Sequence, residues 1–331
     1  MRIIKPVYFD EFACLAGHCP DSCCQEWDVQ VDPASAAFYR SLPGDLGDRL
    51  RQVLIDDGGE TLMTIENRRC PMWQQDGLCR IQAELGHDAL CKTCRDFPRL
   101  THDYGDFVEL GLELSCPEAA RLILADATGT MVTAEAEGIT EADYDTEAME
   151  ILLQTREYAL SLLSDSAYAP NEALALLLVY GYQAQQLLDG GEPPEFDPAL
   201  VLAQAADMAQ PAKAEDMFRF FETLEILTPG WAERLKNPNT PLPWSEEILR
   251  LARYFVRRYW LQAVSDYDLV CRVKFVVISC LVIRNLGGDL TQTAQRYSKE
   301  IENDVDNIDA ILDAAYENPA FTDRKLLGML L

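Results

Sequence analysis

The sequence predicts a mainly α-helical protein. An irregular, cysteine-rich, metal-organised N-terminal domain (1–125) is expected to precede an all-helical C-terminal domain (126–331). Two observations lead to this prediction. Nine of the 11 cysteines lie in the first 116 residues, where Pro and Gly interrupt short apolar runs. From residue 115 onward, apolar residues recur with the spacing of amphipathic helices, without strand–helix alternation.

The first domain is expected to contain only short elements. Residues 27–32 alternate between polar and apolar like a strand, and 62–65 could form a second strand after a turn at 57–59. Because this irregular segment resembles a domain with little apolar core, metal ligation is expected to organise it. Helices are expected over 33–39, 46–55 and 81–90, and 107–114 suits either a strand or a helix.

A further helix is predicted where this domain ends. Ser115, Pro117 and Glu118 fit a capping box with proline near the helix start, and the apolar run continues to Leu124. Cys116 would then lie in the first turn, where the helix dipole lowers the pKa of a thiol and favours the thiolate. The same short pattern therefore predicts a domain junction and a ligand position.

The second domain is expected to be helical. Residues 126–142 are small, polar and acidic, and are predicted to form a loosely ordered connection. Breaks rich in Gly, Pro and Asn then separate the stretches of helical periodicity. The predicted helices cover 142–164, 171–188, 198–208, 213–227, 244–263, 266–286, 290–303 and 306–316.

Charge and composition exclude several classes of protein. The net charge of −27 argues against a nucleic-acid groove; it suits either plain solubility or attraction of a basic, lysine-bearing partner. The N-terminus lacks the features of a signal peptide, and no apolar run reaches the length of a membrane span. We therefore expect a soluble, cytoplasmic protein that binds neither nucleic acid nor membrane. In that compartment, clustered cysteines are more often metal ligands than disulfides.

The cysteine spacing indicates a metal without identifying it. A tetrahedral zinc site or a cubane cluster needs about four soft ligands, so nine thiols can supply one site with spares or two sites. Neither the paired CxxC motifs of a zinc finger nor the ferredoxin run is present, and only Cys91 and Cys94 form a CxxC. The thiols fall into four groups: Cys14, Cys19, Cys23 and Cys24; Cys70 and Cys79; Cys91 and Cys94; and Cys116.

Three cysteine-bearing stretches together resemble the flagellin lysine-N-methylases, within a broader zinc- or iron-chelating cysteine-rich family. They are CLAGHCPDSCCQEWDVQVD (14–32), CPMWQQDGLCRIQAELGHDALCKTCRDFPR (70–99) and ELGLELSCPEAARLIL (109–124). The resemblance implies a protein-lysine N-methyltransferase that uses S-adenosylmethionine and acts on lysines of flagellin or a similar surface protein. It also implies an iron–sulfur cluster, expected to be [4Fe–4S]. The implied ligands are Cys14, Cys19, Cys23, Cys24, Cys70, Cys79, Cys94 and Cys116, with Cys91 as a variable position.

The residues themselves leave the mechanism open. The chain has no GxGxG run in an α/β setting and no CxxxCxxC loop, so neither a standard donor site nor a radical route is predicted. A non-catalytic zinc- or iron-binding protein with a helical interaction domain is the alternative. Neither catalytic nor donor-binding residues are assigned. Candidate bases or lysine-binding groups near the cysteines are Asp21, Glu26, Asp96, Tyr104, Glu109 and Glu113.

Overall fold

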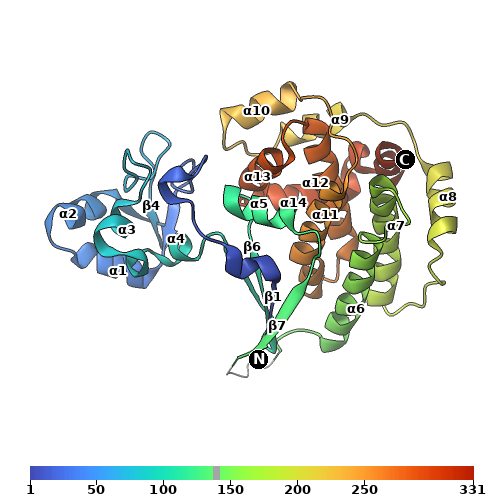
Figure 1. Ribbon diagram of the computed structural model, residues 1–331, viewed down its shortest axis with the longest axis horizontal. Helices are drawn as coiled ribbons and strands as arrows, with labels where there is room; N and C mark the ends of the chain where they lie inside the picture. The colour runs from blue at the N-terminus through green and yellow to red at the C-terminus, as the bar shows by residue number, and fades with distance from the viewer. Residues whose placement is uncertain (137–141) are drawn as a thin grey trace.

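The computed structural model describes residues 1–136 and 142–331 and is mostly helical, with 57% helix and 11% strand. The prediction of a mainly α protein is therefore confirmed, whereas the metal organisation of its N-terminal part remains a prediction. Figure 1 shows a small lobe, drawn in blue and cyan, beside a larger helical body. We call residues 13–98 the small lobe and use this name below.

The small lobe combines short helices with a three-stranded sheet of order β2-β4-β3. The strand predicted over 27–32 is present, and the strand predicted over 62–65 lies two residues earlier. Its elements are β2 (Val29–Val31), α1 (Pro33–Ser41), α2 (Gly44–Val53), β3 (Leu54–Asp57), β4 (Glu60–Met63), α3 (Arg80–Leu85) and α4 (Lys92–Asp96).

A second sheet joins the small lobe to the body. Its order is β5-β6-β1-β7, in which β1 and β6 are parallel and the other two pairings are antiparallel. The strands are β1 (Arg2–Pro6), β5 (Arg99–Asp103), β6 (Phe107–Leu112) and β7 (Met131–Glu135). The expected division after residue 125 crosses this sheet, because β7 follows that position and pairs with β1.

The loosely ordered connection predicted over 126–142 is wrong for the segment that forms β7. Arg2 pairs with Glu135 at one end of the β1–β7 ladder, and Pro6 pairs with Met131 at the other. The partner strand lies more than a hundred residues away, so local composition carries no sign of this pairing. The predicted C-terminal domain (126–331) is therefore not entirely helical. Residues 137–141, which belong to the same predicted connection, lie outside the described residues.

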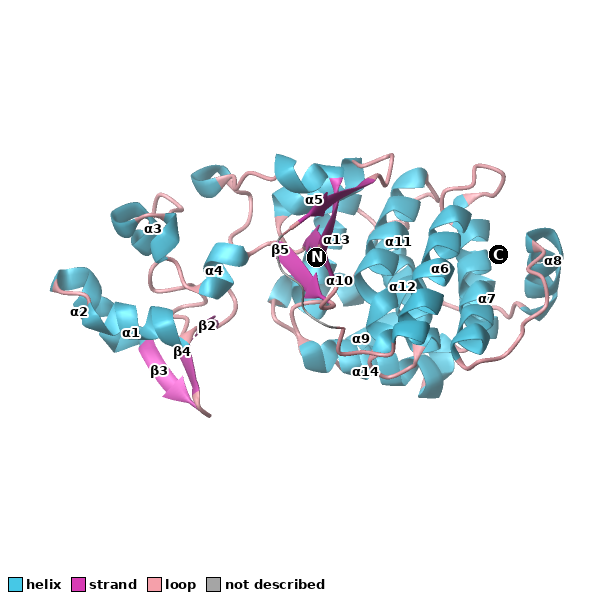
Figure 2. Ribbon diagram, turned by 90° about the horizontal axis from the view of Figure 1, so that it is seen from below, coloured by secondary structure: helices cyan, strands magenta, loops and turns pink. Residues whose placement is uncertain are grey.

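The helical body surrounds α12 (Leu269–Leu286), which is buried along almost its whole length. Such all-round burial is typical of the central helix of a large domain. It packs against α7 and α11, among other helices, as Figure 2 shows from a second direction. The other helices are α5 (Pro117–Ala125), α6 (Thr146–Leu162), α7 (Pro170–Leu188), α8 (Pro198–Met208), α9 (Ala214–Phe221), α10 (Pro229–Lys236), α11 (Glu246–Tyr259), α13 (Leu290–Ile301), α14 (Val305–Glu317) and α15 (Asp323–Leu330).

All eight helices predicted beyond residue 142 are present, and α10 and α15 were not predicted. Several begin with an aspartate whose carboxylate accepts a backbone N–H of the first turn, as Asp145, Asp268 and Asp289 do. None of the described helices combines the length and the apolar character that crossing a membrane requires.

The apolar interior consists of two separate clusters. One lies in the small lobe and includes Tyr39, Leu50 and Met72. The other extends from Phe12 and the second sheet through the helices of the body. The cysteine segments lie in the first cluster and where the two parts of the chain meet, so their positions depend on how the small lobe is held against the body.

Candidate metal centre and adjoining charged network

Four cysteines belong to the small-lobe core. Cys70 and Cys91 are buried there, and Cys24 and Cys79 pack against the same cluster. Backbone contacts hold three of their segments together. The N–H of Cys70 donates to the carbonyl of Cys24 at 2.8 Å, and Trp73 forms a β-bridge with Cys79. Cys24 of the first group of thiols and Cys70 and Cys79 of the second therefore share one small core.

Two pairs of thiols are in direct contact. Cys23 interacts with Cys24, and Cys91 interacts with Cys94 on α4. The interaction lowers the pKa of the Cys23 and Cys91 thiols and raises the pKa of the Cys24 and Cys94 thiols. The third group of thiols, Cys91 and Cys94, also adjoins the small-lobe core, because Cys91 is a buried member of that core.

Cys116 lies outside that core, at the N-cap of α5, and packs against the core of the body. The helix begins at Pro117, so the predicted capping box is wrong. The structure gives α5 no side-chain cap, the Ser115 hydroxyl is buried without a partner among the described residues, and Glu118 pairs with Arg121 at 2.6 Å.

The acidity predicted for Cys116 is also wrong. Burial raises the pKa of its thiol to about 11, and this outweighs the lowering by the backbone N–H groups of Ala119 and Glu118. The thiolate charges of Cys19 and Cys14 raise it further. These two cysteines lie on one short turn, since Cys19 N–H donates to the carbonyl of Ala16, whose own N–H donates to Cys14 Sγ at 3.4 Å.

The donor set suits a soft metal. All 11 cysteines are free thiols. Burial raises the pKa of Cys70 to about 11, and neighbouring thiolate charges raise it further, so a cation among these groups would relieve their repulsion. Within residues 1–136 and 142–331, however, no three His, Cys, Asp or Glu side chains already converge in a metal-binding arrangement. The assignment of metal ligands therefore rests on the thiol character of these side chains and on which cysteine-bearing segments lie next to one another.

Helix α13 ties the cysteine loop to the turn before Cys116. Gln295 Nε2 donates to Asp21 Oδ2 at 2.8 Å and to the carbonyl of Ser115 at 2.7 Å. Lys299 Nζ lies 3.2 Å from Asp21 Oδ2 and 5.7 Å from the centre of the Trp27 ring. Burial alone would raise the pKa of Asp21, but Lys299, Gln295 and a backbone N–H lower it overall. Asp21 therefore acts as a charged anchor, not as a base.

A buried network of charged and tyrosine side chains adjoins the turn that precedes Cys116. Arg258 on α11 lies 3.3 Å from Glu302 and 3.5 Å from Glu113, and it donates to the Tyr254 hydroxyl at 2.7 Å. The Tyr259 hydroxyl donates to Glu302 at 2.9 Å. Cys116 N–H donates to the carbonyl of Glu113 at 3.3 Å, so the network adjoins a predicted ligand. Burial raises the pKa of Glu113, although Arg258 opposes the shift.

Sequence reasoning named Glu113 but missed the four residues around it. Tyr254, Arg258 and Tyr259 stand in an aromatic, apolar stretch that reads as core, and Glu302 follows a distant helix. The one local signal was the spacing of Tyr254 and Arg258, which places two polar groups on one face of a buried helix.

The other predicted bases have structural partners. Glu109 forms a buried, two-pronged ion pair with Arg156, with N–O distances of 2.6 and 2.8 Å. Tyr104 stacks on a phenylalanine of β6, with burial as the main cause of its raised pKa. Glu26 pairs with Arg68, and Asp96 pairs with Lys92 on the surface, each at 2.5 Å. Among the predicted carboxylates, Glu113 best combines burial, a raised pKa and proximity to a predicted ligand.

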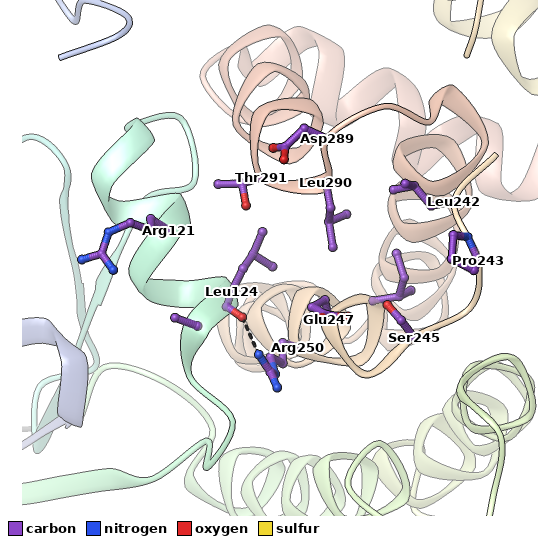
Figure 3. Close-up of a pocket in the computed structure, with 12 residues that line it drawn as sticks. Arg121, Leu124, Leu242, Pro243, Ser245, Glu247, Arg250, Asp289, Leu290 and Thr291 are labelled. Carbon is purple, nitrogen blue, oxygen red and sulfur yellow. Dashed lines mark hydrogen bonds between the residues drawn. The ribbon is translucent and has the colours of Figure 1, made fainter. Parts of the chain in front are cut away.

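A cavity of about 500 Å³ opens among α5, α11 and α13 (Figure 3). Leu124 and Leu290 line it together with the polar side chains of Arg250 and Asp289. Arg250 Nη1 donates to the carbonyl of Leu124 at 2.9 Å, drawn as a dashed line in Figure 3. The cavity borders the C-terminal end of α5, whereas Cys116 lies at its N-terminal end, so the two features are separate.

Comparison with known proteins places these residues in a family. The chain is 28% identical over 197 residues to proteins named Lysine-N-methylase from Salmonella typhimurium and Salmonella choleraesuis, which covers 56% of this chain and 48% of each relative. It spans about half the length of these curated relatives. It is 31% identical over 133 residues to a protein named Flagellar biosynthetic protein FliU from Salmonella muenchen, covering 38% of this chain and 79% of that protein.

No family model matches the sequence, and no solved structure matches it. The family expected from the three cysteine-bearing stretches agrees with the relatives that were found. The coverage of FliU, at more than three quarters of its length, shows the relationship most directly. The chain belongs to the flagellin lysine-N-methylase (FliB-like) family that includes the lysine-N-methylases and FliU of Salmonella.

Proposed function

We propose that this protein is an iron–sulfur-dependent protein-lysine N-methyltransferase that uses S-adenosylmethionine and acts on flagellin or a similar surface protein. The observation that carries the proposal is the match to proteins named Lysine-N-methylase over more than half of this chain. A third relative bears a flagellar name, which supports a flagellar acceptor. The thiol-rich small lobe supports a soft-metal centre, with zinc as the alternative to iron.

The ligands in this proposal are the eight cysteines Cys14, Cys19, Cys23, Cys24, Cys70, Cys79, Cys94 and Cys116. When bound, a metal centre would link the segments that carry these thiolates and offset part of their mutual repulsion. The residues around it have their own tasks. Asp21, Gln295 and Lys299 hold the cysteine loop against the turn that carries Cys116.

Glu113 is the proposed base of the reaction. A lysine ammonium must lose its proton before the amine can attack, and a buried carboxylate with a raised pKa accepts protons more readily than an exposed one. The amine nitrogen then forms a bond to the donor's methyl carbon as the carbon–sulfur bond breaks. The thioether leaves with the bonding electrons, and the proton stays on Glu113. Arg258 and Tyr254 orient the carboxylates of this network.

The test is a methylation assay with anaerobically purified, metal-loaded full-length protein. Purified flagellin is incubated with S-adenosylmethionine, and methylated lysines are mapped by mass spectrometry. We expect methyl groups on lysines with the native protein, and a large loss of kcat with a changed pH profile for Glu113→Gln. Cys280→Ser is the matched control, because Cys280 is buried in α12, away from the proposed ligands.

Calorimetric titration with S-adenosylmethionine separates this function from a non-catalytic metal-binding role. Metal-loaded protein that fails to bind the donor would remove the methyltransferase proposal. Metal analysis of the same sample distinguishes iron with sulfide from zinc. A colourless preparation that holds only zinc and still methylates flagellin would remove the iron–sulfur part alone.

A further inference from the structure

We propose that a cavity between the second sheet and α11 binds the amino-carboxylate part of the methyl donor. The cavity has a volume of about 50 Å³ and shares no lining residue with the larger cavity beside α5. It has room for roughly three or four water-sized groups, which excludes a whole nucleoside but suits a short aliphatic chain with a carboxylate. The inference rests on the proposed function, because it identifies where the donor of that reaction is held.

The floor of the cavity is a row of residues on one face of the second sheet. Leu100 pairs with Gly111 across β5 and β6, and Pro6 pairs with Met131 across β1 and β7. The parallel pairing of β1 with β6 joins the two pairs into one row. All four residues line the cavity, so its floor is apolar.

Gly111 has neither a conformational nor a packing reason to be glycine. Its φ lies outside the left-handed region, and the β5–β6 pairing continues through it in regular register, so it marks neither a turn nor a bulge. A Cβ at this position would lie 3.9 Å from the Leu100 Cβ, which is an ordinary contact distance. Glycine inside a strand weakens the strand and often marks a place where a ligand approaches closely. The absent side chain leaves room above the floor of the cavity.

Helix α11 supplies the polar side of the cavity. Tyr254, Arg257 and Arg258 share one face of this helix by their spacing, and all three line the cavity. Arg257 Nη2 donates to the carbonyl of Gly129 at 2.7 Å, and Arg257 forms no ion pair in the described part of the chain. Because buried charges are normally paired, a partly buried guanidinium without a carboxylate partner is suited to bind the carboxylate of a ligand.

Glu109 and Tyr8 add further polar groups to the lining. Glu109 is paired with Arg156, but its carboxylate oxygens keep lone pairs that an ammonium group can use. The Tyr8 hydroxyl makes no hydrogen bond to any described residue and can donate to a carboxylate. The cavity therefore combines groups for a carboxylate, a group for an ammonium and an apolar floor. This combination matches an aliphatic amino acid, and methionine is the amino acid that S-adenosylmethionine contains.

The cavity also adjoins the proposed base. Tyr254 and Arg258 line it, and Arg258 lies 3.5 Å from Glu113. A donor whose amino-carboxylate is held here would lie next to the network that contains Glu113, with its adenosine outside the cavity. Free methionine carries the same recognised groups, so the test must distinguish it from the donor.

The test is calorimetric titration of the anaerobically purified, metal-loaded, full-length protein. The ligands are S-adenosylmethionine, S-adenosylhomocysteine, L-methionine and 5′-methylthioadenosine, which lacks the amino-carboxylate. We expect the first two to bind, and 5′-methylthioadenosine to bind at least about tenfold more weakly, because it cannot form the charge-assisted hydrogen bonds.

Two variants probe the cavity from opposite sides. Gly111→Val fills the space above the floor and should weaken binding of S-adenosylmethionine by at least about tenfold. Thr101→Val is its matched control, because Thr101 is exposed on the opposite face of the sheet, and it should leave the affinity unchanged. Arg257→Met should weaken binding of S-adenosylmethionine but not of 5′-methylthioadenosine, a selectivity that a purely structural defect would not produce. Circular dichroism verifies folding, and Arg257→Met keeps the test decisive if Gly111→Val does not fold.

The outcomes separate this inference from the proposed function. If folded Gly111→Val and Arg257→Met bind S-adenosylmethionine as the native protein does, or if 5′-methylthioadenosine binds as tightly, the inference is wrong and the proposed function stands. Native protein that binds L-methionine but not S-adenosylmethionine would overturn both. Protein that binds S-adenosylmethionine with the expected losses in both variants, yet methylates no flagellin, would keep this inference and remove the methylation of flagellin.

Discussion

Replacement of Arg258 by methionine tests the buried network most directly. Arg258 is about one-tenth exposed and lies between Glu302, which has no exposed side-chain surface, and Glu113. Methionine has a similar length but no charge, so the variant leaves both carboxylates without their cation. Removing one partner of a buried ion pair costs about 3–5 kcal/mol. Because a folded domain is stable by only about 5–15 kcal/mol, the change should be large.

The stability lost in Arg258→Met should depend on pH in a defined direction. Burial already raises the pKa of Glu113, and removal of Arg258 takes away the charge that opposes this shift. A carboxylate whose folded-state pKa is raised destabilises the protein increasingly as pH rises from its unfolded pKa through its folded pKa. The gap in stability between the native protein and Arg258→Met should therefore be widest at neutral pH and should narrow on acidification.

Denaturant unfolding followed by circular dichroism measures this gap at pH 7 and pH 5. Glu113→Gln in the Arg258→Met background is the matched control, since it removes one of the two unpaired charges. We expect it to restore part of the lost stability at pH 7 and less at pH 5. An unchanged unfolding midpoint in Arg258→Met, or a gap that widens on acidification, would refute the reasoning.

Two further predictions concern packing and the contact between the parts of the chain. Gly181→Ala should lower the unfolding free energy by about 1–3 kcal/mol, because an added Cβ would lie 2.8 Å from the side chain of Val273 on α12; thermal unfolding measures this, and Val273→Ala should relieve only part of the clash, because the Val273 Cβ would still lie 2.9 Å from the added Cβ. Lys299→Met should cost about 1–3 kcal/mol by leaving half-buried Asp21 without its cation. The lowered pKa of Asp21 means that its contribution to stability is present above its unfolded pKa and is lost as pH falls through its folded pKa. Acid should therefore increase protease cleavage between the small lobe and the body, and Asp21→Asn should remove this dependence.

Long helices were the most predictable part of the fold. Residues 198–208 were predicted without error at either end, because Asp197 caps the helix and its first residue is proline. The helices that were missed, α10 and α15, have eight residues each, too few for helical periodicity to stand out. Local signals therefore sufficed where a helix was long and capped.

The second sheet could not be predicted in the same way. β1 lies between β6 and β7, which follow it by more than a hundred residues. Neither Arg2–Pro6 nor Met131–Glu135 shows a pattern that would identify a partner at that distance. Strand pairing is decided by what the rest of the chain brings alongside, so short exposed strands leave little trace in the sequence.

The sequence by itself determined which groups are available for chemistry. The crowding of nine thiols into the first 116 residues is a property of the chain, and the stretches that carry these thiols are enough to indicate the family. Tertiary structure alone decided which of these groups meet. Cys116 lies near Cys14 and Cys19 because α13 holds both segments, and Glu113 is buried against Arg258 because α11 packs beneath the turn. The type of donor is a local property, whereas proximity arises from the packing of segments far apart in the chain. For that reason a spacing pattern could indicate candidate ligands but not which of them lie close together.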